Sequence, residues 1–168
     1  MALAQIAGAT AEEIKQAMAS FRGVDRRFDF KIKNDHQVFL TDYAHHPEEI
    51  KQSIRSIKEL YADKKITAIF QPHLYSRTRD FYKEFAKGLS LADDVILLDI
   101  YPAREAPIPG VTSKLIYDNL APEVTKRMCT KDELLDLIQN SDFDVLIALG
   151  AGDIENYAPQ IAEILKDR

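Results

Sequence analysis

The sequence predicts an α/β fold with three layers, in which helices cover both faces of a mostly parallel sheet of about six strands. Three observations predict it. Short apolar runs alternate with amphipathic segments from residue 28 to residue 166, and this alternation is typical of parallel sheets. Runs such as "VILLDI" and "VLIALG" are almost continuously apolar, as strands covered on both faces are. The short polar turn "KNDHQ" joins the first two extended segments and predicts one antiparallel edge strand. The expected arrangement is Rossmann-like.

The first elements follow from the spacing of apolar residues. Residues 11–21 are predicted to form a helix with Thr10 as its cap. Residues 28–32 alternate apolar and charged side chains, which predicts a half-buried strand. "QVFLTDY" is the next strand, and a helix follows at residues 47–61, where Pro47 suits the first turn. The predicted buried stripe of this helix consists of Ile50, Ile54, Ile57 and Leu60.

The remaining elements alternate in the same way. "KITAIFQ" is a predicted strand, and the helix after it, at residues 76–91, is expected to bury Phe81, Phe85 and Leu89 on one face. "DVILLDI" is a strand that ends in a proline-rich loop. The elements beyond that loop are a helix at 113–120, a short strand "EVTKRM", a helix at 131–139, the strand "DVLIALG" and a helix at 154–166.

Length and composition suit one globular domain. The chain has 168 residues, of which 46% are hydrophobic and 29% charged, so it can bury a core. The net charge of -5 argues against a general nucleic-acid surface, which needs basic residues to neutralise phosphates. Cys129 is the only cysteine, so no intrachain disulfide is expected and the cytoplasm is the expected compartment. No apolar run approaches the roughly 20 residues of a membrane span.

Polar side chains follow three of the predicted strands at the point where each strand ends. The three segments are "DYAHHP", "QPHLYSRTRD" and "GAGDIENY". Ligands of open parallel sheets bind beyond the carboxyl ends of the strands, so these side chains are expected to gather at one edge. The candidate site residues in the first two segments are Asp42, Tyr43, His45, His73 and Arg77.

Each of these residues also has a purely structural interpretation. Asp42 could cap the helix after it, and Arg77 and Arg79 could form a solvated helix face. The histidines could be ordinary surface groups, and His36, in the hairpin turn, is assigned no role. Zinc is disfavoured, because adjacent histidines do not easily face one ion and "HExxH" is absent. Neither "GxSxG" nor "GxxxxGK[ST]" occurs, and "GAGDI" is only half of a dinucleotide fingerprint.

Four segments together resemble a known family. "GVDRRFDF", "DYAHHPEEI", "FQPHLYSRTRDF" and "YPAREAPIPGVTS" occur in the order found in the C-terminal domain of the Mur ligases. The double histidine, with the "QPH" segment, is similar to the branch of this family that adds alanine. The resemblance implies an ATP-dependent acid–amino-acid ligase that joins L-alanine to UDP-N-acetylmuramate through an acyl phosphate, in peptidoglycan precursor synthesis.

The resemblance also implies a domain division. Residues 1–24 would be the last helix and hinge of the central ATPase domain, and residues 25–168 the C-terminal domain. ATP and Mg²⁺ would be held mainly by the missing central domain and the UDP-sugar by a missing N-terminal domain, so the fragment alone is expected to be inactive. The competing interpretation is a free-standing, non-catalytic α/β domain that binds a nucleotide or a protein partner.

Roles for individual residues follow from the same resemblance. Arg27 is expected to approach the ATP phosphates, and Asp42 to hydrogen-bond the ribose, as suits an acceptor-only carboxylate. Arg77 is the natural bidentate partner of the amino-acid carboxylate. Arg27 and His45 are the expected catalytic residues. The expected alanine pocket consists of Tyr43, His45, His73 and Arg77.

Four further features of the sequence lie outside these roles. His46 belongs to the double histidine but has no assigned role. Leu74 stands where some relatives have a basic residue, which leaves Arg77 as the main cation for the alanine carboxylate. The loop at residues 104–113 is expected to be a mobile flap, and the backbone of "GAGDI" to support the pocket through its N–H groups.

Overall fold

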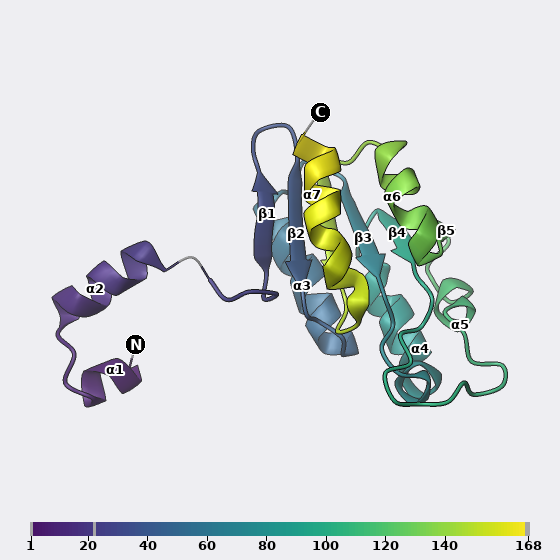
Figure 1. Cartoon of the computed structure of the whole chain (residues 1–168), viewed down its shortest axis with the longest axis horizontal. Coiled ribbons are helices and arrows are strands. Elements are labelled where there is room, and N and C mark those ends of the chain that lie inside the picture. Colours follow the sequence, from purple (N-terminus) through teal and green to yellow (C-terminus); the bar gives the residue numbers. More distant parts are fainter. Residues whose placement is uncertain (1, 22, 167–168) are drawn as a thin grey trace.

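The structure, a computed structural model, describes residues 2–21 and 23–166. Its elements are α1 (Ala2–Ile6), α2 (Ala11–Ser20), β1 (Asp29–Lys33), β2 (Val38–Asp42), α3 (Pro47–Leu60), β3 (Ile66–Phe70), α4 (Tyr75–Leu89), β4 (Asp94–Leu97), α5 (Lys114–Tyr117), β5 (Thr125–Met128), α6 (Lys131–Gln139), β6 (Val145–Leu149), the 3₁₀ helix η1 (Asp153–Tyr157) and α7 (Ala158–Lys166). The predicted three-layer α/β fold is confirmed (Figure 1).

The six strands form one sheet in the order β1-β2-β6-β3-β4-β5. The β1–β2 pair at the edge is antiparallel and every other pair is parallel, as the polar hairpin turn predicted. The last strand of the chain, β6, lies between β2 and β3. The carboxyl ends of β2, β6 and β3 are therefore neighbours, at the lower edge of the sheet in Figure 1.

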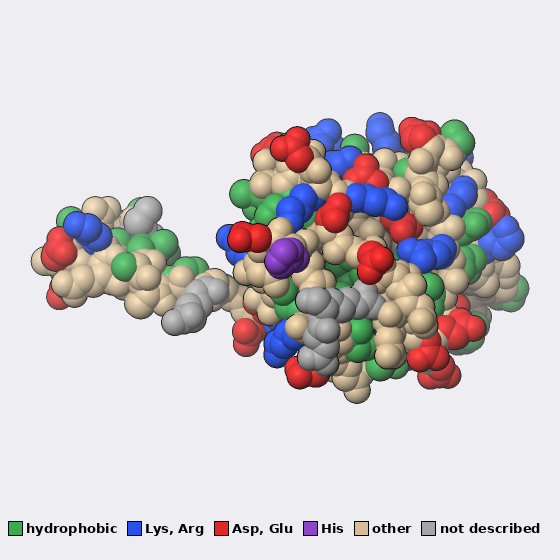
Figure 2. All heavy atoms as spheres, turned by 90° about the horizontal axis from the view of Figure 1, so that it is seen from above, with side chains coloured by type: hydrophobic (Ala, Val, Ile, Leu, Met, Phe, Trp, Pro, Cys, Tyr) green, Lys and Arg blue, Asp and Glu red, His purple; other side chains and the backbone are tan. Residues whose placement is uncertain are grey.

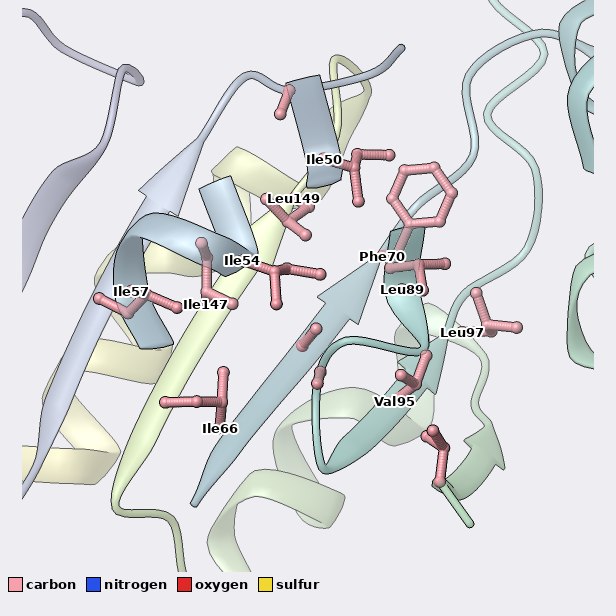
Figure 3. Close-up of a cluster of buried hydrophobic side chains, with 14 of the residues drawn as sticks. Ile50, Ile54, Ile57, Ile66, Phe70, Leu89, Val95, Leu97, Ile147 and Leu149 are labelled. Carbon is pink, nitrogen blue, oxygen red and sulfur yellow. The ribbon is translucent and has the colours of Figure 1, made fainter. Parts of the chain in front are cut away.

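The core has two layers, one on each face of the sheet. Figure 3 shows the first, in which isoleucines of α3 and Leu89 of α4 lie over β6, β3 and β4. On the opposite face, α6 and α7 cover side chains such as Leu146 and Ile69. Burying each such side chain stabilises the fold by about 1.5–3 kcal/mol. The apolar strands are thus covered on both faces, as their composition predicted.

Two predicted core positions are wrong. Leu60 is 60% exposed, because the buried stripe of α3 continues from Ile57 to Tyr61, four residues on, and Tyr61 packs against the core instead. Phe81 is 38% exposed. The backbone of α4 is not helical at this residue (φ -126°, ψ 15°), and the next residue, Tyr82, packs against the core in its place.

The strand β1 carries a bulge that the alternating pattern did not predict. Phe30 pairs with Leu40 and Ile32 pairs with Phe39, so two residues of β1 span one step of β2. Phe28 and Phe30 therefore face the α3 layer, whereas Ile32 faces the α7 layer. Because β1 is antiparallel, its start lies beside the end of β2, and this brings the residues before it to the carboxyl edge.

Several helix boundaries differ from prediction. The helix α4 begins at Tyr75 and ends at Leu89, and α5 is only four residues long. The predicted terminal helix is divided into η1 and α7. A short additional helix, α1, precedes α2. Along residues 2–21 and 23–166, no helix has both the length and the apolar character needed to cross a lipid bilayer.

The N-terminal helices form an arm that projects from the body (Figures 1 and 2). The predicted helix at residues 11–21 is confirmed as α2, with Thr10 and Glu13 in a capping box. Ile14 of α2 is half-buried, but Met18 is 52% exposed and Phe21, the C-cap residue, is 58% exposed. The domain boundary near residue 24 stays a prediction. Residues 1, 22 and 167–168, which belong to the two predicted domains, lie outside the residues that the structure describes. On the body, acidic and basic side chains are interspersed on the face that Figure 2 shows.

Candidate functional site

Backbone hydrogen bonds join the three polar segments at the carboxyl edge. The N–H of Gln71, after β3, donates to Leu149 O of β6 over 3.0 Å. The N–H of Gly150, after β6, donates to Asp42 O of β2 over 3.2 Å. The predicted gathering of these segments is therefore observed, and their side chains share one surface.

The first segment forms a tight turn before α3. The His45 ring lies 5.1 Å from the Tyr43 ring, and its Nδ1 donates to Tyr43 O over 2.9 Å. In a neutral ring, Nε2 is then the nitrogen free to accept a proton. Glu49 accepts hydrogen bonds from the N–H groups of His45 and His46, over 3.0 and 3.1 Å. Burial favours a higher pKa for Glu49, but these N–H groups and the nearby positive charge of Arg27 hold it below its ordinary value.

The tandem arginines before β1 have different surroundings. Arg26 lies over the Tyr43 ring, with Cζ 4.5 Å from the centroid, and its Nε is 3.9 Å from Glu155. Arg27 is exposed, with Cζ 5.3 Å from the same ring. Arg26 and Phe28 both have left-handed backbones (φ 63° and 49°), which is unfavourable for residues other than glycine. The segment is thus tied to the domain through Arg26, while Arg27 is presented at the edge.

Asp42 does not cap the helix that follows it. The N-cap residue of α3 is His46, so the capping interpretation is wrong. The Asp42 carboxylate instead accepts a hydrogen bond from Ser53 Oγ over 2.5 Å, from the second turn of α3. This bond fixes the carboxylate at the end of β2, and no sequence pattern predicts it, because the two residues lie on different elements.

The second segment brings His73 and Arg77 to the same edge. The His73 ring lies 6.1 Å from the His45 ring and is stacked on Tyr101 at 5.7 Å. Burial lowers the pKa of His73, and the positive charge of Arg77 lowers it further, against the opposing charge of Glu105. The environment therefore favours a neutral His73.

Three buried polar atoms at this edge make no hydrogen bond within the described chain, and one of them, Arg26 Nε, has the Glu155 carboxylate 3.9 Å away. The other two are His73 Nδ1 and Arg77 Nη1. Leaving such atoms unpaired costs about 1–3 kcal/mol each, so they indicate a place for a polar ligand. The solvated-face interpretation fits Arg79, which is exposed and pairs with Asp80 at 2.7 Å, whereas Arg77 is half-buried.

The glycines of "GAGDI" allow close packing. A Cβ at Gly150 would lie 2.8 Å from Gln71 O, and one at Gly152 would lie 2.8 Å from the Cβ of Tyr101. The N–H of Ile154, at the start of η1, already donates to Gln71 Oε1 over 3.0 Å. This segment therefore supports the site by bringing backbones together, and the resemblance to a dinucleotide fingerprint has no further support.

The proline-rich loop is attached to α4 at its beginning. Glu105 accepts from Ser76 N over 2.9 Å and from Ser76 Oγ over 2.5 Å. These two bonds hold the pKa of Glu105 below its ordinary value. Glu105 thus attaches the loop at residues 104–113, which was expected to be a mobile flap, to α4. Sequence reasoning missed Tyr101 and Glu105, although their position after a parallel strand was a signal that could have found them.

The described part of the chain contains no group of three or more histidine, cysteine, aspartate or glutamate side chains arranged to hold a metal ion. His45 and His73 approach each other through their rings. Asp42 is engaged by Ser53. These residues therefore do not offer Mg²⁺ a set of oxygen ligands of the kind that it prefers.

Comparisons with known proteins identify the family. Residues 26–152 match the family described as "Mur ligase, glutamate ligase domain". The UDP-N-acetylmuramate–L-alanine ligase of Phocaeicola vulgatus is 70% identical over 168 residues, which are 100% of this chain and 37% of that protein. The ligase of the same name from Parabacteroides distasonis is 53% identical over 98% of this chain and 36% of its own length.

A solved structure is similar over nearly the whole chain. It is the UDP-N-acetylmuramate-alanine ligase of Thermotoga maritima, with a TM-score of 0.78 and 30% identity, covering 99% of this chain and 36% of that one. The chain thus spans a little over a third of the length of the relatives that it matches. By the match over residues 26–152, the chain belongs to the Mur ligase family and carries its glutamate ligase domain.

Proposed function

We propose that the chain is the C-terminal domain of an ATP-dependent ligase that joins L-alanine to UDP-N-acetylmuramate, and that it supplies contacts to both ATP and L-alanine. The observation that carries the proposal is the unpartnered pair His73 Nδ1 and Arg77 Nη1 at the carboxyl edge. Relatives with this name and 70% or 53% identity support the choice of substrates. Because those relatives are nearly three times as long, they also disfavour a free-standing domain.

The amino-acid contacts centre on Arg77. Its guanidinium has donors only, so its partner is an acceptor, and the carboxylate of L-alanine fits a bidentate contact. Leu74 supplies no second cation, so Arg77 carries most of this recognition. We assign neutral His73, together with Tyr43 and His45, to the walls of the same pocket. We assign to His45, whose Nε2 is the accepting nitrogen of the neutral ring, the removal of a proton from the alanine ammonium, so that the free amine can attack.

The nucleotide contacts lie at the β2 side of the edge. Exposed Arg27 would face the phosphates as they transfer, and the Asp42 carboxylate would accept from ribose hydroxyls. In the reaction, the γ-phosphoryl group of ATP passes to the sugar carboxylate, the alanine amine attacks the resulting acyl carbon, and phosphate leaves. Mg²⁺ would neutralise phosphate charge. We assign Mg²⁺ and the UDP-sugar to segments outside residues 1–168, and the exposed apolar face of α2 to contact with them.

A chimera tests this proposal. In the Phocaeicola vulgatus ligase, the matched segment is replaced by residues 1–168, which are 70% identical to it. We expect the chimera to show L-alanine-dependent ATP hydrolysis with UDP-N-acetylmuramate present. The isolated chain, measured beside it, is expected to show none, because it has no Walker-type loop. A folded chimera without alanine-dependent turnover, or an isolated chain with it, would contradict the proposal.

Asp42→Asn in the chimera tests the ribose contact. Asparagine keeps an acceptor for Ser53 Oγ, so we expect the melting temperature to stay unchanged. A hydrogen bond to a charged group contributes about 1.5–3 kcal/mol against about 1 for a neutral one, so the KM for ATP should rise several-fold. Asp99→Asn is the matched control, since Asp99 is an exposed aspartate just beyond β4. If the Asp42 and Asp99 variants have the same KM for ATP, Asp42 has no ribose role.

A further inference from the structure

Tyr101 is joined to His73 through both backbone and ring. The N–H of Tyr101 donates to Pro72 O over 2.8 Å, and Tyr101 O accepts from Leu74 N over 3.0 Å. The two residues form an isolated parallel bridge. Their rings are stacked, with centroids 5.7 Å apart and planes inclined by 24°.

His73 needs this support because no hydrogen bond among residues 2–21 and 23–166 fixes its ring through Nδ1. The next residue, Leu74, has a left-handed backbone with φ 74°, a conformation that persists only where the surroundings impose it. The hydrogen bond from Leu74 N to Tyr101 O is one of the contacts of this backbone. Tyr101 in turn packs closely against Gly152, since a Cβ at Gly152 would lie 2.8 Å from the Cβ of Tyr101.

Glu105 supports Arg77, the second residue of the unpartnered pair His73 and Arg77. The N-cap position of α4 is Leu74, whose side chain cannot accept a hydrogen bond. Glu105 takes over this function from the loop, since it accepts from the N–H and the hydroxyl of Ser76 in the first turn. Arg77 is the next residue along, so the hydrogen bonds that Ser76 donates to Glu105 fix the turn that carries the guanidinium.

We propose that Tyr101 and Glu105 are positioning residues of the amino-acid site, Tyr101 for the His73 ring and Glu105 for the helical turn that carries Arg77. The loop after β4 thereby forms a rigid wall of the site. The inference rests on the proposed function, in that the pocket it shapes is the one assigned to L-alanine.

The ring contact is tested by NMR on the isolated 168-residue chain. The chain has four histidines, so their ring signals are few, and the signal that His73→Gln removes belongs to His73. Stacking on Tyr101 should shift the His73 ring protons upfield. We expect Tyr101→Phe to keep this shift and Tyr101→Leu to abolish it. An unchanged His73 signal in a folded Tyr101→Leu variant would overturn the role of Tyr101.

The effect on substrate use is measured in the chimera. Tyr101→Leu and Glu105→Ala are each expected to raise the KM for L-alanine by about tenfold, with the KM for ATP unchanged. Tyr101→Phe and Glu105→Gln, which keep the ring and one acceptor oxygen, should restore most of the loss. A purely structural role predicts equal losses for both substrates, and that result would overturn the inference. A parent chimera that does not use L-alanine would refute the proposed function, whereas the NMR experiment still decides the ring contact.

Discussion

Arg77→Ala in the chimera is expected to lower kcat/KM for L-alanine by at least about 30-fold, with little change in the KM for ATP. Removing one partner of a desolvated, charge-assisted contact costs about 2–5 kcal/mol, and the lower value corresponds to a factor of about 30. Arg77 is half-buried and its Nη1 has no partner within the described chain. Leu74 offers no second cation to compensate. The measurement is steady-state kinetics with each substrate varied in turn.

Arg79→Ala is the matched control for this prediction. Arg79 is on the same helix, two residues further on, but its side chain is 53% exposed and paired with Asp80, so its loss should have little effect on any substrate. Arg77→Lys keeps the charge but loses the planar fork, so an intermediate loss is expected. An Arg77→Ala enzyme that uses L-alanine as well as the Arg79→Ala enzyme does would remove Arg77 from the pocket.

The fold could be predicted because its signals are local and repeated. Continuous apolar runs gave the buried strands, and the turn "KNDHQ" gave the antiparallel edge. The errors in predicting the core occur where the backbone conformation of one residue decides which side chains face it. At Phe81 the backbone of α4 leaves the helical region, and between Phe30 and Ile32 a bulge changes the face. Both the kink and the bulge depend on contacts with other elements, and the apolar periodicity of one element carries no information about such contacts.

The site could be predicted in its position but only partly in its contacts. The rule for parallel sheets placed the segments of Asp42 and His73 at one edge, and the structure brings them together. The bonds from Ser53 to Asp42 and from Ser76 to Glu105 join residues 11 and 29 positions apart. No short motif records such pairs. The sequence predicts that the backbone N–H groups of "GAGDI" support the pocket, whereas the neighbours of its glycines are Gln71 and Tyr101.

Gly150→Ala is expected to reduce the free energy of unfolding of the isolated chain by about 2–6 kcal/mol, because two penalties act together. Gly150 has φ 145°, a backbone region that is nearly restricted to glycine and costs about 1–3 kcal/mol for other residues. The new methyl group would also lie 2.8 Å from Gln71 O, where the backbone cannot yield easily, and such overpacking costs about 1–3 kcal/mol.

Urea denaturation of the Gly150→Ala chain, with Gly110→Ala as control, separates these two penalties. Gly110 also has a positive φ, 78°, but a Cβ there would meet nothing within 4 Å, so its substitution carries only the conformational cost of about 1–2 kcal/mol. The difference between the two variants therefore measures how tightly the strand ends are packed. Since the N–H of Gly150 also donates to Asp42 O, a close packing means that β2, β6 and β3 hold the site as one rigid edge. Equal stability of the two variants would show instead that the edge opens enough to accept a methyl group, and the close approach of Gly150 to Gln71 would then have no role in fixing the site.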